Sequence, residues 1–119
     1  MDHLFVYGTL LRGSRNKFAR MIEDGARFVG SARVAGRLYD LGEYPGAVPS
    51  DQADCWVEGE VWQLDDPQLL PLLDDYEGSE FERAMASVQT GNTVLDCSLY
   101  WYIGPATGRL IASGNWLKR

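Results

Sequence analysis

The sequence predicts one α+β domain built around a small, bent, mixed sheet or barrel. Strand-like segments dominate the chain, two short helices interrupt them, and no linker, repeat or low-complexity tract divides residues 1–119. The length of 119 residues matches a single domain that buries roughly two thirds of its unfolded surface. Hydrophobic residues make up 45% and charged residues 24%, which places the chain among ordinary globular domains.

The first third of the chain is expected to begin with a strand, a loop and a helix. Residues 4–7 form the predicted strand, which ends abruptly at Gly8. From Lys17 the segment KFARMIED carries apolar residues at helical spacing, so a short helix follows the loop. Residues 26–42 contain β-prone pieces broken by glycines, which predicts two strands with tight bends.

The middle of the chain is expected to contain a loop, a strand and the second helix. Residues 43–54 are predicted to form a loop that turns at a Pro-Gly pair. The alternating residues 56–64 predict a strand. Residues 65–78 predict a helix with Asp66 as its N-cap, Pro67 as its first residue and Gly78 as its C-cap. Pro71 lies late for a first turn, so the alternatives are a kinked helix or one that starts nearer Pro71.

The last part of the chain is expected to form a hairpin and a short tail. Residues 82–89 and 93–103 are the predicted strands, and Gly91–Asn92 is the predicted turn between them. The tail is expected to add a short edge segment and to pack Trp116 against the core.

The charge pattern argues against a nucleic-acid partner. The formal net charge is −6, and the basic residues are scattered rather than gathered in a block or stripe. No apolar stretch approaches roughly 18 residues, so no membrane partner is expected. Cys55 and Cys97 are too far apart for a metal or redox motif, and without a visible export signal they are expected to be reduced thiols in a cytoplasmic protein. The sequence leaves the oligomeric state open.

Several common catalytic motifs are missing from the chain. His3 is the only histidine and no GxSxG segment is present, so a Ser-His-Asp triad is not expected. No P-loop or GxGxxG run marks a nucleotide site. Four aspartates lie near the second predicted helix, where caps and solvated faces are typical, so no metal is expected. These aspartates are Asp65, Asp66, Asp74 and Asp75.

Glu77 departs from the pattern of the second predicted helix. On a helical wheel, the leucines of residues 69–73 and Tyr76 form one apolar arc, and Glu77 falls inside it. Burial, the negative end of the helix dipole and two neighbouring aspartates would all raise its pKa and make it a stronger base. The alternative is a helix that ends earlier, so that Glu77 faces solvent or pairs with Arg83.

Four segments together resemble the gamma-glutamylcyclotransferase-like family. They are FVYGTLLRG at 5–13, LYDLGEYPGAV at 38–48, LDDYEG with FERA at 73–84, and the tail IASGNWL. The tail is similar to the ending of small bacterial members. The resemblance spans nearly the whole chain and implies a compact mixed β-barrel with two or three short flanking helices and a pocket at one end.

The resemblance also implies a reaction. Family enzymes release the amine part of a gamma-glutamyl compound and close the glutamyl part into 5-oxoproline, without a cofactor. In that family a Tyr-Gly-Thr-Leu loop cradles the glutamyl group and a Glu after a helix is the base, which here is Glu77. The loop corresponds to Tyr7, Gly8, Thr9 and Leu10. Tyr44 lies in the stretch that resembles the pocket rim.

The loop after the first predicted strand is suited to hold an anion. Gly8 lets the backbone approach a ligand without an intervening Cβ. Successive N–H groups from Thr9 to Leu11 can form a concavity at the start of the first helix, which would suit the substrate's α-carboxylate or an oxygen gaining charge. The alternative is an ordinary turn followed by core leucines.

Arg83 and Tyr102 are the remaining candidates for the pocket wall. Tyr102 shares one strand face with Tyr100, so its hydroxyl lines a polar cavity or its ring is simply a half-buried aromatic. Arg83 pairs with Glu77 or with the substrate carboxylate, or it forms an ordinary surface ion pair.

Three functions fit these residues. A cyclotransferase acting on a small gamma-glutamyl substrate is favoured because Glu77 is present. A non-catalytic module that binds a gamma-glutamyl or other small carboxylate is the second, and a different transferase or hydrolase using the same loop is the third. The departing group is left open among an amino acid, a polyamine, a lysine side chain and the cysteinylglycine of glutathione.

Overall fold

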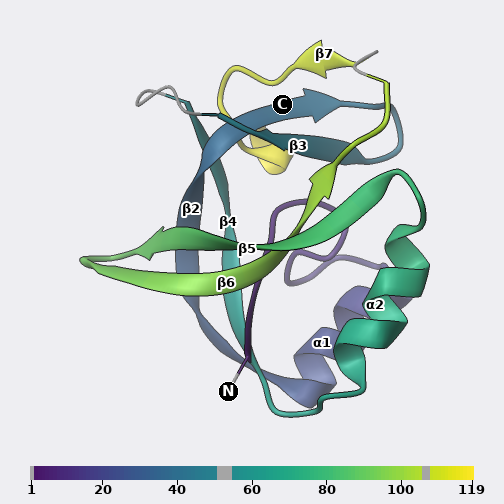
Figure 1. The fold of residues 1–119 in the computed structure, drawn as a ribbon, viewed down its shortest axis with the longest axis vertical. Coiled ribbons are helices and arrows are strands. Elements are labelled where there is room, and N and C mark those ends of the chain that lie inside the picture. Colours follow the sequence, from purple (N-terminus) through teal and green to yellow (C-terminus); the bar gives the residue numbers. More distant parts are fainter. Residues whose placement is uncertain (1, 51–54, 106–107) are drawn as a thin grey trace.

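Five strands pair side by side, out of chain order, to close a barrel, and two helices pack against one side of it (Figure 1). The computed structural model describes residues 2–50, 55–105 and 108–119. The barrel order is β2-β4-β1-β6-β5, and the pairing of Arg33 with Gln89 joins β5 back to β2. These strands are β1 (Asp2–Val6), β2 (Ala26–Asp40), β4 (Trp56–Leu64), β5 (Phe81–Thr90) and β6 (Thr93–Tyr102). β1 and β6 run parallel and the other barrel pairs are antiparallel, so the predicted mixed β-barrel is confirmed.

Two short strands lie outside the barrel along the end of β2. They are β3 (Pro45–Pro49) and β7 (Arg109–Leu110), and both run antiparallel to β2. A turn of 3₁₀ helix, Trp116–Lys118, ends the chain. Trp116 is buried, which confirms the predicted edge segment and packed tail.

The first helix, α1 (Lys17–Gly25), begins where the sequence predicts. The Asn16 side chain caps it by accepting a hydrogen bond from the Phe18 N–H at 2.8 Å. Ala19 and Ile22 are buried on the face that meets the barrel. No helix in the described ranges is long and apolar enough to cross a membrane.

The second helix, α2 (Leu69–Glu77), begins two residues after the predicted first residue Pro67, which agrees with the alternative of a start nearer Pro71, and Asp66 is not its N-cap. The Asp66 carboxylate instead accepts from the Gln68 N–H in the preceding turn. Pro71 is the third helical residue, where no backbone N–H is required, so it does not kink the helix. Gly78 has a φ of 76° and ends the helix as predicted.

Residues 26–49 differ most from the prediction. Residues 26–40 form one strand with a bulge between Phe28 and Gly30, rather than two strands. A Cβ on Gly36 would lie 2.8 Å from the Val48 carbonyl oxygen, so this glycine allows β3 to pack closely. The predicted loop contains β3, whose prolines lie at the two ends of an edge strand, where they are tolerated. Residues 51–54 of that predicted loop lie outside the described ranges.

The hairpin of β5 and β6 is confirmed, with its turn at Gly91. The core has two parts that share β1. Phe5 and Tyr7 pack with the barrel interior, whereas Leu4 and Val6 pack with the helices. The loop that follows β1 therefore starts where the two parts of the core meet.

Candidate active site

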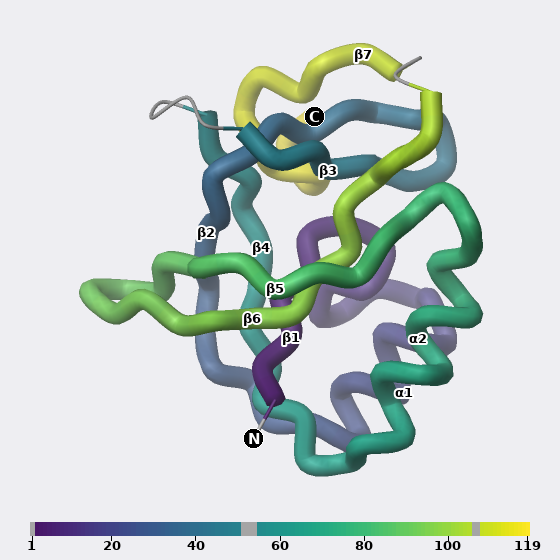
Figure 2. Tube along the Cα trace, in the orientation of Figure 1, coloured from purple at the N-terminus to yellow at the C-terminus, as the bar shows by residue number. Residues whose placement is uncertain are grey.

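A cavity of about 390 Å³ opens beyond the end of β1. Three segments surround it: the loop at residues 7–10, residues 44–45 where β3 begins, and residues 76–81, which run from the end of α2 across the link to the start of β5. Figure 2 shows that this link passes beside the turn between β2 and β3, and the Tyr44 and Phe81 ring centroids are 6.0 Å apart. The inner wall consists of Phe5, Val6 and Tyr100.

Tyr7 is buried, and its hydroxyl is fully engaged by the backbone. It donates to the Tyr100 carbonyl oxygen at 2.6 Å and accepts from the Ala47 N–H at 3.3 Å. Burial raises the pKa of Tyr7, and the nearby Glu77 charge adds to the rise. The protonated phenol therefore ties the loop to β6 and β3.

Gly8 has a packing role that differs from the one inferred from the sequence. A Cβ on Gly8 would lie 2.6 Å from the Pro45 Cγ, so the glycine makes room for a wall of the cavity. The Leu11 N–H donates to the Gly8 carbonyl oxygen at 3.0 Å and closes a turn. The predicted run of three N–H donors is therefore wrong at Leu11. The N–H groups of Thr9 and Leu10 have no hydrogen-bond partner in the described part of the chain.

Tyr76 connects this loop to both helices. Its hydroxyl lies 3.1 Å from the Thr9 Oγ1 and accepts from the Asn16 side-chain amide. Its ring also packs against Phe18, with 4.4 Å between centroids. Since Asn16 caps α1 at the same time, one small network fixes the loop relative to α1 and α2.

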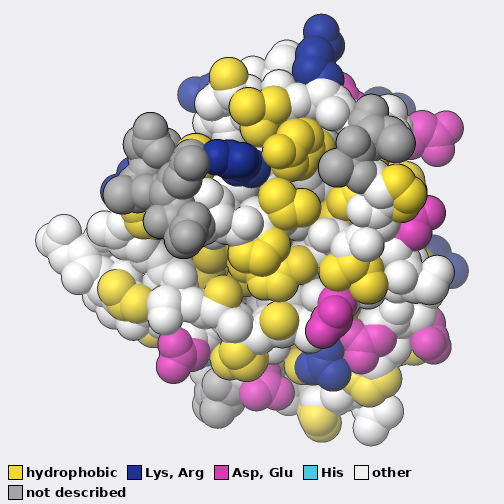
Figure 3. Space-filling view, turned by 45° about the horizontal axis from the view of Figure 1, so that its top comes forward, with side chains coloured by type: hydrophobic (Ala, Val, Ile, Leu, Met, Phe, Trp, Pro, Cys, Tyr) yellow, Lys and Arg dark blue, Asp and Glu magenta, His cyan; other side chains and the backbone are white. Residues whose placement is uncertain are grey.

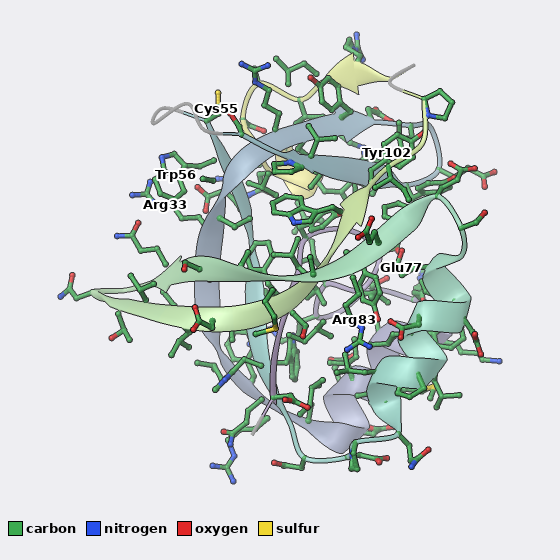
Figure 4. The ribbon with its side chains drawn as sticks, in the orientation of Figure 1. Arg33, Cys55, Trp56, Glu77, Arg83 and Tyr102 are labelled. Carbon is green, nitrogen blue, oxygen red and sulfur yellow. The ribbon has the colours of Figure 1, made fainter. Side chains whose placement is uncertain are left out.

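Glu77 is the last residue of α2, is half-buried and lines the cavity (Figure 4). Burial raises its pKa from 4.5 to about 7. The helix continues through Glu77, as the wheel requires, and Arg83 pairs with Asp74 instead, with 2.9 Å between Nε and Oδ1. A carboxylate in this state exchanges a proton readily at neutral pH.

Arg83 and Tyr102 are not among the residues that line the cavity. The Tyr102 hydroxyl donates to the Pro105 carbonyl oxygen at 2.7 Å, and its ring packs edge-on against Phe81. Tyr100, on the same strand face, lines the cavity instead and donates to Asp74 at 2.7 Å. Figure 4 shows Glu77 between the positions of Arg83 and Tyr102.

Some residues that line the cavity were not among the predicted site residues. They are Phe5, Val6, Pro45, Tyr76, Gly78, Ser79, Glu80, Phe81 and Tyr100. Strand alternation indicates that Tyr100 and Tyr102 share a face, but it does not indicate which one reaches the cavity. Among the described residues, no group of three or more His, Cys, Asp or Glu is arranged to hold a metal ion.

The family model for gamma-glutamyl cyclotransferase, AIG2-like proteins matches residues 4–118. The chain belongs to this family. It is 34% identical over 119 residues to the gamma-glutamylcyclotransferase family protein YtfP of Escherichia coli K12, covering 98% of this chain and 96% of that protein. It is also 36% identical over 101 residues to human gamma-glutamylaminecyclotransferase, covering 75% of this chain and 63% of the human protein.

Solved structures of the cyclotransferase family share the fold. The mouse AIG2-like protein has a TM-score of 0.81 at 27% identity, covering 97% of this chain and 87% of that one. The solution structure of Escherichia coli ytfP has a TM-score of 0.69 at 34% identity, covering 97% of this chain and 96% of that one. The expected membership of the gamma-glutamylcyclotransferase-like family is therefore confirmed.

Proposed function

We propose that this protein is a cofactor-independent cyclotransferase that cleaves a gamma-glutamyl amide, releasing 5-oxoproline and an amine. One observation carries the proposal: a half-buried carboxylate with a pKa of about 7 lines the same cavity as two residues whose backbone N–H groups make no hydrogen bond within the described part of the chain. The carboxylate is Glu77, and the N–H groups belong to Thr9 and Leu10. Membership of the cyclotransferase family supports the same reaction.

Glu77 acts as the base in the proposed first step. It removes a proton from the substrate's α-ammonium group, and the freed lone pair attacks the γ-carbonyl carbon. Because the nucleophile and the carbonyl belong to one substrate, holding the glutamyl chain folded supplies a large gain in effective concentration. Glu77 then passes the proton to the nitrogen of the departing amine as the amide C–N bond breaks, and the ring nitrogen gives its remaining extra proton to this amine, which leaves as an ammonium ion.

The loop at residues 7–10 binds the glutamyl group in this proposal. The N–H groups of Thr9 and Leu10 hold the α-carboxylate or the oxygen that gains charge in the tetrahedral intermediate. Tyr7 and Gly8 position these donors through Tyr100, Ala47 and Pro45. Tyr44 covers the outer part of the substrate.

Arg83 and Tyr102 contribute indirectly. Arg83 holds Asp74, which accepts the hydrogen bond from the cavity residue Tyr100. Tyr102 supports Phe81 from behind. We therefore assign both residues to positioning the wall of the binding site rather than to direct contact with the substrate.

The Glu77→Gln variant tests the reaction and the base together. Purified protein is incubated with gamma-glutamyl amides, and 5-oxoproline is measured. Wild-type kcat/KM should rise with pH through about 7, where Glu77 loses its proton. The variant should fold and bind the amides but lose at least about 100-fold in kcat, the usual contribution of a general base.

Two results would contradict this proposal. Near-normal turnover by Glu77→Gln would remove Glu77 from the chemistry. Binding of the amides to the wild-type protein without any 5-oxoproline would favour the small-molecule binding module. The cytoplasmic location expected from the sequence stays a prediction, which cell fractionation would test.

A further inference from the structure

Glu77 is surrounded by hydroxyl groups, yet it accepts a hydrogen bond from none of them. Its carboxylate has no hydrogen-bond or ion-pair partner among the described residues. A half-buried carboxylate usually accepts a hydrogen bond from a neighbouring donor, so the hydroxyl groups around it must be held by other acceptors. The titratable side chains that line the cavity with Glu77 are Tyr7, Tyr44, Tyr76, Glu80 and Tyr100.

Most of these hydroxyl groups are engaged away from Glu77. The Tyr7 hydroxyl donates to the Tyr100 carbonyl oxygen at 2.6 Å. The Tyr76 hydroxyl belongs to the network that joins the loop to both helices. Tyr44 is exposed, so its hydroxyl can bond to water. The side chain of Tyr100 is then the phenol whose direction decides whether Glu77 has a partner.

Asp74 takes the proton of Tyr100. The Tyr100 hydroxyl donates to the Asp74 Oδ1 at 2.7 Å, and the Arg83 Nε lies 2.9 Å from the same oxygen. Burial raises the pKa of Tyr100, and the bond to Asp74 adds to the rise, so the phenol stays protonated and remains a donor. One carboxylate oxygen therefore accepts from a phenol and a guanidinium together, which fixes the direction of the phenol.

Asp74 and Glu77 are neighbours on the same helix. They are three residues apart on α2, so their side chains lie next to each other along one side of it. The Glu77 charge also contributes to the raised pKa of Tyr100, as expected for two groups that lie close together. The other acceptor beside this hydroxyl is the Leu70 carbonyl oxygen, at 3.5 Å, which is too far for a strong bond.

The pair formed by Asp74 and Arg83 is open to solvent on one side. The exposed fractions of the two side chains are 38% and 39%. On the face drawn in Figure 3, basic and acidic side chains likewise lie in contact beside a strip of hydrophobic side chains. Exposed ion pairs contribute little to stability by themselves. The effect of this pair is therefore geometric, because it keeps the Asp74 carboxylate turned toward Tyr100.

We propose that Asp74, held by Arg83, is a positioning residue that directs the Tyr100 hydroxyl away from Glu77 and so leaves the base free of hydrogen bonds. This inference rests on the proposed function, because it concerns the strength of the same base. A hydrogen bond to an ionised carboxylate stabilises the ionised form and makes it a weaker base. Without Asp74, the phenol would turn to Glu77, since a charged carboxylate is a stronger acceptor than the neutral Leu70 carbonyl.

NMR titration of the Glu77 carboxyl carbon tests the proposal without any need for turnover. The signal is identified by its absence from the Glu77→Gln protein. Asp74→Ala should lower the Glu77 pKa, which is about 7 in wild type, by about one pH unit, the effect of one added hydrogen bond. Asp74→Asn should lower it by less than about half a unit, because the amide oxygen still accepts from Tyr100. Tyr100→Phe added to Asp74→Ala should restore the wild-type value.

The pH profile of kcat/KM extends the test to the reaction. In Asp74→Ala the rise of kcat/KM should occur about one pH unit lower than in wild type and should reach a lower plateau, because a weaker base accepts the substrate proton less readily. Asp75→Ala is the matched control. It removes an exposed charge from the same helix and should keep the wild-type profile.

Three results would overturn the positioning role. The first is a Glu77 pKa in Asp74→Ala that equals the value in Asp74→Asn. The second is a lowered pKa that persists when Tyr100→Phe is added. The third is a raised Glu77 pKa in Tyr100→Phe alone, which would show that the phenol already donates to Glu77 in wild type.

The two measurements separate this inference from the proposed function. If wild-type protein forms no 5-oxoproline but the titrations shift as expected, the reaction is wrong and the positioning of Tyr100 by Asp74 stands. If 5-oxoproline is formed and the Glu77 pKa does not change in Asp74→Ala, the positioning role is wrong and the reaction stands.

Discussion

The Glu77 carboxylate lies in surroundings that favour its neutral form, and this has a cost in stability. Its pKa is 4.5 in an unperturbed chain and about 7 in the folded protein. Below pH 4.5 both states hold the proton and there is no penalty. Above pH 7 the folded state must carry a partly desolvated charge, which lowers the free energy of unfolding by up to about 3 kcal/mol. Glu77→Gln should therefore be more stable than wild type at pH 8 and equally stable near pH 4.

Urea denaturation at a series of pH values measures this difference. Asp75→Asn is the matched control, because Asp75 is exposed on the same helix and its substitution should change stability by less than about 0.5 kcal/mol at either pH. A Glu77→Gln protein that is less stable than wild type at pH 8 would contradict the burial of this side chain.

Periodicity identified Glu77 but not its neighbours in the cavity. One helix with a clear apolar arc is sufficient to show that a carboxylate falls on the buried side. Glu80 and Phe81 follow the helix, where no repeating geometry applies, so their positions depend on how the link meets the β2–β3 turn. Tyr100 likewise requires knowledge of where α2 packs against β6.

The loop after β1 and the strand β3 form a single packed unit at the level of elements. Gly8 leaves room for the ring of Pro45, the first residue of β3, and the Tyr7 hydroxyl accepts a hydrogen bond from the Ala47 N–H in the same strand. A Cβ on Gly8 would lie 2.6 Å from a proline ring carbon that has little freedom to move. Gly8→Ala should therefore lower the free energy of unfolding by about 1–3 kcal/mol. The added Cβ should also displace Pro45 from the wall of the cavity, so substrate affinity should fall.

Gly25→Ala is the control for this substitution. Gly25 ends α1, and a Cβ there would have no heavy atom within 4 Å. Its replacement should be neutral or slightly stabilising because it reduces the freedom of the unfolded chain. A Gly8→Ala protein with wild-type thermal stability and KM would show that the loop and β3 are not packed as described.

Glycine and proline positions explain why element boundaries in residues 26–49 could not be predicted. A glycine in a β-prone segment is consistent with a bend and with a close approach of another strand, and only the partner strand distinguishes them. At Gly36 the close approach is clear, because an added Cβ would lie 2.8 Å from the Val48 carbonyl oxygen. The strands with regular alternation, β4 and the β5–β6 hairpin, were predicted correctly.

The two parts of the core are joined through β1, and the tail completes the part inside the barrel. Trp116 is 7% exposed and packs with the barrel interior, while the Gly114 carbonyl oxygen accepts from the Glu58 N–H of β4 at 2.8 Å. Trp116→Ala should lower the free energy of unfolding by about 3–5 kcal/mol through the lost contacts and the cavity left behind. Leu117→Ala, at a side chain that is 71% exposed, should have little effect.

The way in which Trp116→Ala unfolds tests whether the barrel and the helical layer behave as one unit. Because β1 contributes Phe5 to the barrel interior and Leu4 to the helical side, loss of either part should remove the support of the other. Tryptophan fluorescence and far-UV circular dichroism should therefore give coincident urea transitions, at lower urea than in wild type. A helical signal that persists after the fluorescence transition would show that α1, α2 and β1 hold together without the barrel. In that event the loop and Glu77 would have a stability separate from that of the tail.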